Sequence, residues 1–147
     1  MKLKLFQVDA FTNKIFSGNP AAICPLEKWL PDDTMQKIAN ENNLAETAFY
    51  VKKADDYELR WFTPVKEVDL CGHATLATAF VLFEFFKYNK PQINFHTRSG
   101  VLTVEKEKDF LKMNFPKDNI QKIESLPQIT EAIGIKPLET YKGRDDY

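Results

Sequence analysis

The segment most informative about the fold is residues 72–88, GHATLATAFVLFEFFKY. After the first two positions, the polar residues up to position 87 are Thr75, Thr78, Glu84 and Lys87, so no single face of a helix here is polar. A helix that is apolar nearly all round must be enclosed by protein or lipid. This stretch is shorter than the roughly 20 apolar residues that span a bilayer. It therefore predicts a central helix that is buried and wrapped by strands.

Segments on both sides of this helix have the alternation and the β-branched or aromatic residues that are typical of strands. We expect strands over residues 2–8, 21–24, 47–51, 58–63, 92–97, 101–106, 110–115 and 140–143. A helix is expected from Pro31 to Asn43, because proline and two acids suit its first turn, and a short helix over 126–135. Many strands with few helices predict an α+β protein.

Charge and cysteine content exclude several classes of function. Twenty basic and twenty-one acidic residues give a net charge of -1, so the sequence provides no basic surface for nucleic acid or an anionic membrane. The first ten residues contain no uninterrupted apolar core of the kind that a secretion signal needs. Cys24 and Cys71 are far apart and lack metal-ligand spacing, so we expect reduced thiols, no metal and a cytoplasmic location.

The residues Cys71, Gly72, His73 and Ala74 stand at the predicted start of the buried helix. Unpaired N–H groups and the positive end of the helix dipole favour an anion there, and Gly72 would let a ligand approach the backbone. A cysteine at such a position is expected to have a lowered pKa. The alternative is structural: Cys71 is then a small core residue and His73 only caps the helix.

Glu46 and Asn19 are the other candidates for chemistry. Glu46 stands at the start of a predicted strand between apolar neighbours, and partial burial would suit it to take up and return a proton. It could equally be a solvated glutamate at a strand end. Asn19 offers a donor and an acceptor within the segment SGNP, which could face a ligand or be a plain turn.

Four motifs occur in order along the chain: FSGNPAA at 16–22, LAETAF at 44–49, LRWFTP at 59–64 and EVDLCGHATLA at 67–77. Together they resemble the PhzF family of phenazine-biosynthesis-type isomerases. The resemblance implies a diaminopimelate-epimerase-like fold, in which each of two lobes is a curved mixed sheet around a central helix. The active site of the family lies between the lobes.

The resemblance also implies site roles. The glutamate matching Glu46 is the general acid/base that moves a proton between substrate carbons, and the histidine matching His73 lines the pocket. Asn19, Gly72, Cys71 and Ala74 are then expected to contact the substrate. No cofactor is implied. The best understood member isomerises a dihydro-hydroxyanthranilate on the route to phenazines. Cys71 also resembles the catalytic thiol of the related racemases and epimerases, so a thiol-dependent reaction is an alternative.

Family members are about twice as long as this chain. We expect an N-terminal lobe over residues 1–118, and a linker with the start of a second lobe over 119–147. The second lobe of the family supplies an aspartate, so the site is expected to be incomplete without it. Without the second lobe, the apolar wall of the cleft is exposed, which predicts self-association, most simply as a homodimer. The expected substrate is a small molecule. A non-catalytic binding or interaction module is the further alternative.

Overall fold

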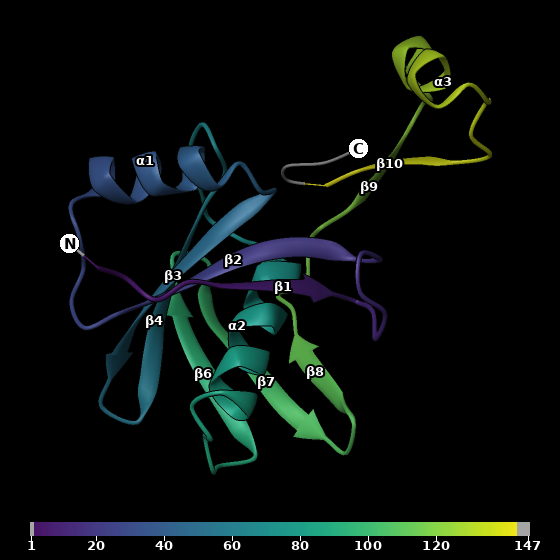
Figure 1. Ribbon diagram of the computed structural model, residues 1–147. Helices are drawn as coiled ribbons and strands as arrows, with labels where there is room; N and C mark the ends of the chain where they lie inside the picture. The colour runs from purple at the N-terminus through teal and green to yellow at the C-terminus, as the bar shows by residue number, and fades with distance from the viewer. Residues whose placement is uncertain (1, 144–147) are drawn as a thin grey trace. The chain divides into compact units, whose positions relative to one another are not determined.

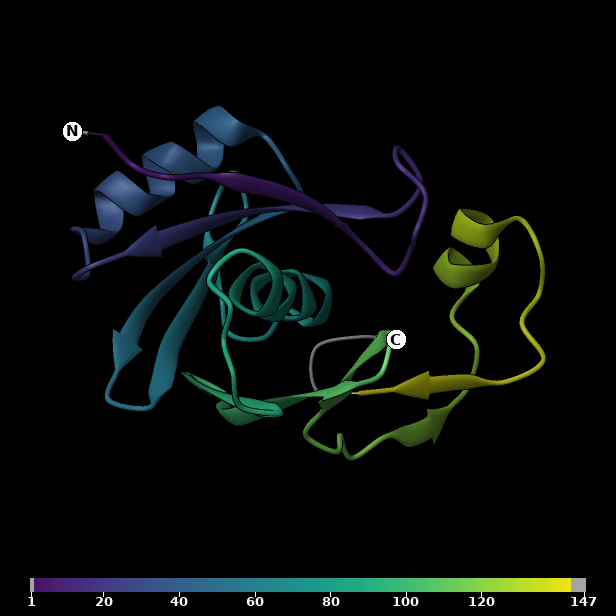
Figure 2. The same cartoon turned by 60° about the horizontal axis from the view of Figure 1, so that its bottom comes forward.

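Helix α2 (Gly72–Glu84) lies at the centre of a curled β-sheet. In the computed structural model, which describes residues 2–143, strands lie on three sides of this helix (Figures 1 and 2). The sheet has eight strands in the order β1-β2-β3-β4-β6-β7-β8, with β5 paired to β4. Its strands are β1 (Phe6–Ala10), β2 (Asn19–Leu26), β3 (Glu46–Lys53), β4 (Asp56–Phe62), β5 (Glu67–Val68), β6 (Gln92–Thr97), β7 (Gly100–Glu107) and β8 (Phe110–Asn114).

The pairing of the strands is mixed. Antiparallel neighbours join β1 to β2, β3 to β4 and β6 to β7 to β8. Two parallel pairs need crossovers: α1 (Asp32–Asn42) connects β2 to β3, and α2 lies on the connection from β4 to β6. The predicted α+β class, with a curved mixed sheet around a buried helix, is confirmed.

The central strands are buried on both faces because two cores flank them. Side chains such as Ile23 and Trp61 face α2, while Phe49 and Phe62 pack on the opposite face against α1. Strands buried on both faces read as nearly continuous apolar runs, as in the AICPL segment of β2 and the TAFYV segment of β3. The sheet is thereby packed between its two helices, which positions the end of β3 where Glu46 stands.

The expectation that α2 is enclosed on every face is wrong in part. Val81 and Phe83 are buried, but Phe80 is 41% exposed. Strands β1 and β8 are the two ends of the strand order and are not paired with each other, so the sheet does not close around the helix. An open seam of this kind leaves one apolar stripe of α2 without a covering strand.

Most elements lie where the sequence predicts them. Helix α1 ends with Asn43 in the left-handed conformation, φ 48°, which asparagine tolerates better than most residues. Helix α2 ends at Glu84, and Lys87 with φ 53° marks the turn away from it. The sequence did not predict β5 or the short strand β9 (Gln121–Ile123).

The chain divides into two compact units, Met1–Phe115 and Pro116–Tyr147. The second contains β9, α3 (Pro127–Ile133) and β10 (Thr140–Lys142), with β9 and β10 paired antiparallel. Position 1 of the expected lobe and positions 144–147 of the expected second segment lie outside the described residues. No helix within residues 2–143 is long and apolar enough to cross a membrane.

Candidate active site

Two distant parts of the chain bring Glu46 and His73 together. Glu46 is the first residue of β3, and the parallel register of the sheet places it opposite Ala21 of β2. His73 is in the first turn of α2. Because α2 runs along the inner face of the sheet, its first turn meets the beginning of β3. The fold thus brings together a carboxylate and an imidazole from two separate elements.

The contact between these two side chains is close and leaves hydrogen-bonding capacity unused. His73 Nε2 and Glu46 Oε2 lie 3.2 Å apart, with side-chain exposures of 9% and 19%. The two atoms are not aligned for a hydrogen bond, and neither has another hydrogen-bond partner among the described residues. Buried polar atoms without partners carry a free-energy cost. A third group that forms hydrogen bonds with both atoms would remove that cost.

Cys71 completes the cluster, but its thiol is not acidified as the sequence predicts. Its sulfur lies 3.4 Å from His73 Nδ1, and it precedes α2 in an extended conformation. Burial raises the pKa of Cys71 to about 12; the backbone N–H of Ala74 acts in the opposite direction, while the negative charge of Glu46 and a hydrogen bond with its carboxylate add to the increase. Desolvation therefore outweighs the helix N-terminus, and the expected lowering of the pKa is wrong.

The start of α2 also differs from expectation at Gly72. A Cβ atom at this position would lie 2.9 Å from two ring carbons of Phe115. The space beside Gly72 is therefore filled by an aromatic ring of the same unit, so close packing explains the glycine better than room for a ligand. The backbone N–H of Ala74 faces the sulfur of Cys71. No acidic residue occupies the first turn of α2, so the negative charge that faces the positive end of the helix dipole comes from Glu46 of β3.

Asn19 lies near this cluster in the sheet without joining it. It is the first residue of β2, two positions before Ala21, the partner of Glu46 in the register. Its side chain is half-buried and makes no hydrogen bond to another of residues 2–143. The structure thus brings together Glu46, His73 and Cys71, and leaves Asn19 at the same end of the sheet with a free amide.

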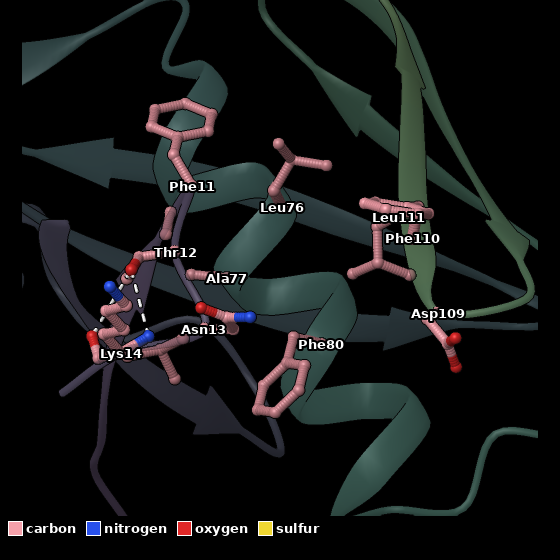
Figure 3. Close-up of a pocket in the computed structure, with 12 residues that line it drawn as sticks. Phe11, Thr12, Asn13, Lys14, Leu76, Ala77, Phe80, Asp109, Phe110 and Leu111 are labelled. Carbon is pink, nitrogen blue, oxygen red and sulfur yellow. Dashed lines mark hydrogen bonds between the residues drawn. The ribbon is translucent and has the colours of Figure 1, made fainter. Parts of the chain in front are cut away.

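A hollow of about 820 Å³ lies over the open stripe of α2. Figure 3 shows its walls: residues 12–14 of the β1–β2 loop on one side, Asp109 and the start of β8 on the other, and Leu76, Ala77 and Phe80 of the helix between them. Glu46 and His73 do not line it. The hollow begins one turn of α2 beyond His73, and Phe11 links the two, because its ring centroid lies 6.5 Å from that of His73.

Phe11 was not predicted as a site residue, although the segment SGNP, which begins in the same loop, was a candidate to face a ligand. Phe11 and Phe16 bracket the β1–β2 loop, and both adopt left-handed backbone conformations with φ 67° and 61°. Bulky residues rarely adopt this conformation, and such strain is concentrated at functional sites. No sequence signal marks it, since a phenylalanine in a loop gives no sign of its backbone angles.

Comparison with known proteins agrees with the architecture. Residues 8–138 match the family model described as phenazine biosynthesis-like protein. An uncharacterized isomerase from Pseudomonas aeruginosa is 53% identical over all of this chain and 56% of its own length. A PhzF-family crystal structure from Enterococcus faecalis superposes with a TM-score of 0.89 at 50% identity, covering 99% of this chain and 56% of the other.

A predicted epimerase from Pseudomonas aeruginosa shares the fold at a TM-score of 0.71, with 19% identity, over 91% of this chain and 51% of the other. The chain spans about half the length of the relatives that it matches. The curled mixed sheet, the central helix and these matches agree with one another, and the chain belongs to the PhzF family, the phenazine biosynthesis-like proteins.

Proposed function

We propose that this chain supplies the acid/base half of a PhzF-like isomerase that shifts a proton on a small carboxylate-bearing metabolite without a cofactor. Glu46 takes the proton from one carbon and returns it to another. His73 lies beside Glu46 and donates or accepts a hydrogen bond at Nε2. The N–H of Ala74 faces Cys71, so the N–H groups of Gly72 and His73, which have no partners within the helix, stabilise the negative charge that develops on the substrate.

The observation that carries this proposal is the pair of buried atoms at its centre. Glu46 Oε2 and His73 Nε2 lie 3.2 Å apart, and neither is hydrogen-bonded within the described residues. A structural ion pair would be expected to use its hydrogen bonds. A site that receives a substrate instead holds donor and acceptor groups in place before the substrate arrives.

We further propose that Asn19 and the hollow beside Phe11 bind the substrate. The half-buried amide of Asn19 is available to a polar group of the substrate. The walls formed by Phe11, Leu76 and Phe80 suit an apolar or ring-shaped portion. This combination favours a small carboxylic acid with an unsaturated or cyclic skeleton over a sugar or a nucleotide.

We further propose that this lobe needs a second lobe for turnover, since the matched relatives are nearly twice its length. The cytoplasm is the proposed location. Cys24 and Cys71 are both free and buried, which suits a reducing compartment.

The test uses this chain alone and this chain fused to the remaining portion of the 53% identical relative. A panel of small unsaturated carboxylic acids is incubated in D₂O, and deuterium at carbon is followed by NMR. We expect the fusion to incorporate deuterium, and Glu46→Gln to slow it by about 10²–10⁴-fold, the usual contribution of a general acid/base. A Glu46→Gln fusion that exchanges at the unaltered rate would refute the role of Glu46.

Cys71→Ala in the same fusion distinguishes a thiol-dependent mechanism from the acid/base mechanism of Glu46. Sγ of Cys71 lies 3.4 Å from a ring nitrogen that could take its proton, so a thiol reaction has a base at hand. The raised pKa of Cys71 opposes this reaction. We expect Cys71→Ala to exchange deuterium at a rate within a few-fold of the parent fusion, whereas a thiol mechanism requires complete loss. Binding of a panel member without any exchange would favour the non-catalytic module.

A further inference from the structure

Cys71 has no part in the proton shift proposed above, yet its sulfur lies in the same cluster as Glu46 and His73. One ligand atom from each of these three residues lies within 4.8 Å of the other two. Thiolate sulfur, imidazole nitrogen and carboxylate oxygen are the ligands that Zn²⁺ takes in proteins. Sequence spacing does not reveal this set, because Glu46 is on β3 while the other two residues lie at the start of α2.

Each of two pairs in the cluster has the separation found between two atoms that share a zinc ion, although the pairs use different nitrogens of His73. Tetrahedral bonds of about 2.3 Å to sulfur and about 2.0 Å to nitrogen hold those two ligand atoms about 3.5 Å apart. Cys71 Sγ and His73 Nδ1 lie 3.4 Å apart. The same geometry holds nitrogen and oxygen about 3.3 Å apart. His73 Nε2 and Glu46 Oε2 lie 3.2 Å apart.

One adjustment is still needed before all three residues can bind the same ion. A zinc ion bonds to only one nitrogen of an imidazole, and Cys71 and Glu46 face different nitrogens of the His73 ring. A rotation of that ring or of the Glu46 carboxylate brings the third ligand into range, since the three ligand atoms are already within 4.8 Å. Glu46 Oε2 has no hydrogen bond to lose in this movement among the described residues.

The charges of the site also balance around a divalent cation. On binding, Cys71 releases its proton to solvent, as thiol ligands of zinc do, and Glu46 contributes a carboxylate. Two negative charges, a neutral imidazole and Zn²⁺ sum to zero. The cluster is therefore better suited to Zn²⁺ than to a monovalent ion.

We infer that Cys71, His73 and Glu46 form a zinc site with three protein ligands and an open fourth position, and that bound Zn²⁺ blocks proton transfer by Glu46. The blocking rests on the proposed function, whereas the binding does not. A carboxylate bonded to zinc gives up a lone pair of one oxygen and part of its negative charge to the metal, so it is a weaker base towards the substrate proton. Zinc would act here as a reversible inhibitor that occupies the acid/base group itself.

The chain itself, freed of metal by a chelator, tests the binding with Co²⁺ as a coloured probe. We expect one equivalent of Co²⁺ to bind and to produce the absorption of a thiolate–cobalt bond, and Zn²⁺ to displace it. Cys71→Ser should remove that absorption and weaken binding by at least about tenfold. The matched control is Cys24→Ser, because Cys24 is also a buried free cysteine but packs in the α1 core. It should leave absorption and affinity unchanged.

X-ray absorption at the zinc edge examines the unaltered protein, so this result does not depend on the folding of a variant. We expect one sulfur and two or three nitrogen or oxygen neighbours around zinc. A zinc environment without sulfur, or a cobalt–thiolate absorption that survives Cys71→Ser and disappears in Cys24→Ser, would overturn the site.

The fused two-lobe protein tests the inhibition. We expect Zn²⁺ to stop deuterium exchange in the parent and in Cys24→Ser at the same concentration. Whatever activity Cys71→Ser retains should need at least about tenfold more zinc. Equal sensitivity of all three proteins would overturn the inhibitory role. If Glu46→Gln exchanges as fast as the parent while Co²⁺ still binds through Cys71, the proposed function fails and the metal site stands.

Discussion

Cys71 shows how burial controls the chemistry of a single residue. Its pKa is raised to about 12 and that of Cys24 to about 11, both mainly by loss of hydration. In the unfolded chain both thiols return to the ordinary value of 9.0. Between pH 9 and the raised pKa of each thiol, the thiol keeps its proton in the folded state and loses it in the unfolded state. The free energy of unfolding is therefore at its full value below about pH 9 and falls as the pH rises above it.

We accordingly expect each thiol to lower the free energy of unfolding by up to about 1.4 kcal/mol per pH unit above pH 9. Urea unfolding with chelator and reductant, at about pH 8 and about pH 10, measures this. Cys71→Ala should flatten the dependence. An equal loss of stability in the parent and in Cys71→Ala would show that Cys71 ionises as easily when folded as when unfolded.

Glycine is required at position 18 because a larger side chain has no space there. A Cβ at this position would lie 2.5 Å from the carbonyl oxygen of Ala10 and 2.7 Å from a methyl group of Thr12. The first of these is backbone and cannot move away cheaply. We expect Gly18→Ala to destabilise the fold by roughly 1–3 kcal/mol, measured by urea unfolding.

Ser17→Ala is the matched control for this substitution, because Ser17 is the exposed neighbour of Gly18. It should change stability by less than about 0.5 kcal/mol. Equal effects of the two substitutions would contradict the steric explanation.

At the scale of single elements, α2 has one covered and one open face. Phe83 is buried, whereas Phe80 is 41% exposed over the hollow between β1 and β8. We expect Phe83→Ala to cost about 3–5 kcal/mol of unfolding free energy, because it leaves a cavity. Phe80→Ala should cost less than about 1 kcal/mol. Thermal and urea unfolding of the two variants measure the difference, and a larger loss for Phe80→Ala would place the open seam elsewhere.

Elements with a strong repeating pattern were predictable from sequence, and short ones were not. The apolar run of α2 and the alternation of β6 and β7 indicate directly whether each segment is a helix or a strand and that it is buried. Strands β5 and β9 contain two and three residues, which is too short for any period to show. The exposure of Phe80 was not predictable either, because it depends on whether the ends of the sheet meet.

The candidate site was predictable only through the motifs. Neither Glu46 nor His73 differs locally from a strand-end glutamate or a capping histidine. Their separation of 3.2 Å arises from the register of β3 and the position of α2, which are tertiary features. The raised pKa of Cys71 could not be read from sequence for the same reason: the desolvation that causes it is a property of the packed core.

For the whole molecule, the open seam predicts self-association through a second copy of the chain. Phe11, Phe80 and Phe110 line the hollow and are exposed, and β1 and β8 each have one edge without a strand partner in the described sheet. Unpaired edges beside an apolar surface favour pairing with another chain. Two identical surfaces of this kind can satisfy each other about a twofold axis, so we propose a homodimer.

Sedimentation at micromolar concentration tests the homodimer. We expect the parent chain to sediment as a dimer and the double substitution Phe80→Ser with Phe110→Ser to sediment as a monomer. Val65→Ser, which alters an exposed apolar residue that does not line the hollow, should remain dimeric. A monomeric parent, or a dimer that is indifferent to the double substitution, would contradict the proposal.

The proposed chemistry depends on the contact between the Glu46 carboxylate and the imidazole of His73, and the nitrogen NMR spectrum of the two histidines reports on this contact. The chain has only His73 and His96, and each faces its own carboxylate: His96 Nε2 lies 3.1 Å from Asp56 Oδ2. We expect Glu46→Gln to shift the Nε2 resonance of His73 alone and Asp56→Asn to shift that of His96 alone. An unmoved His73 resonance in Glu46→Gln, with His96 responding normally to Asp56→Asn, would contradict the pairing on which the proposed chemistry depends.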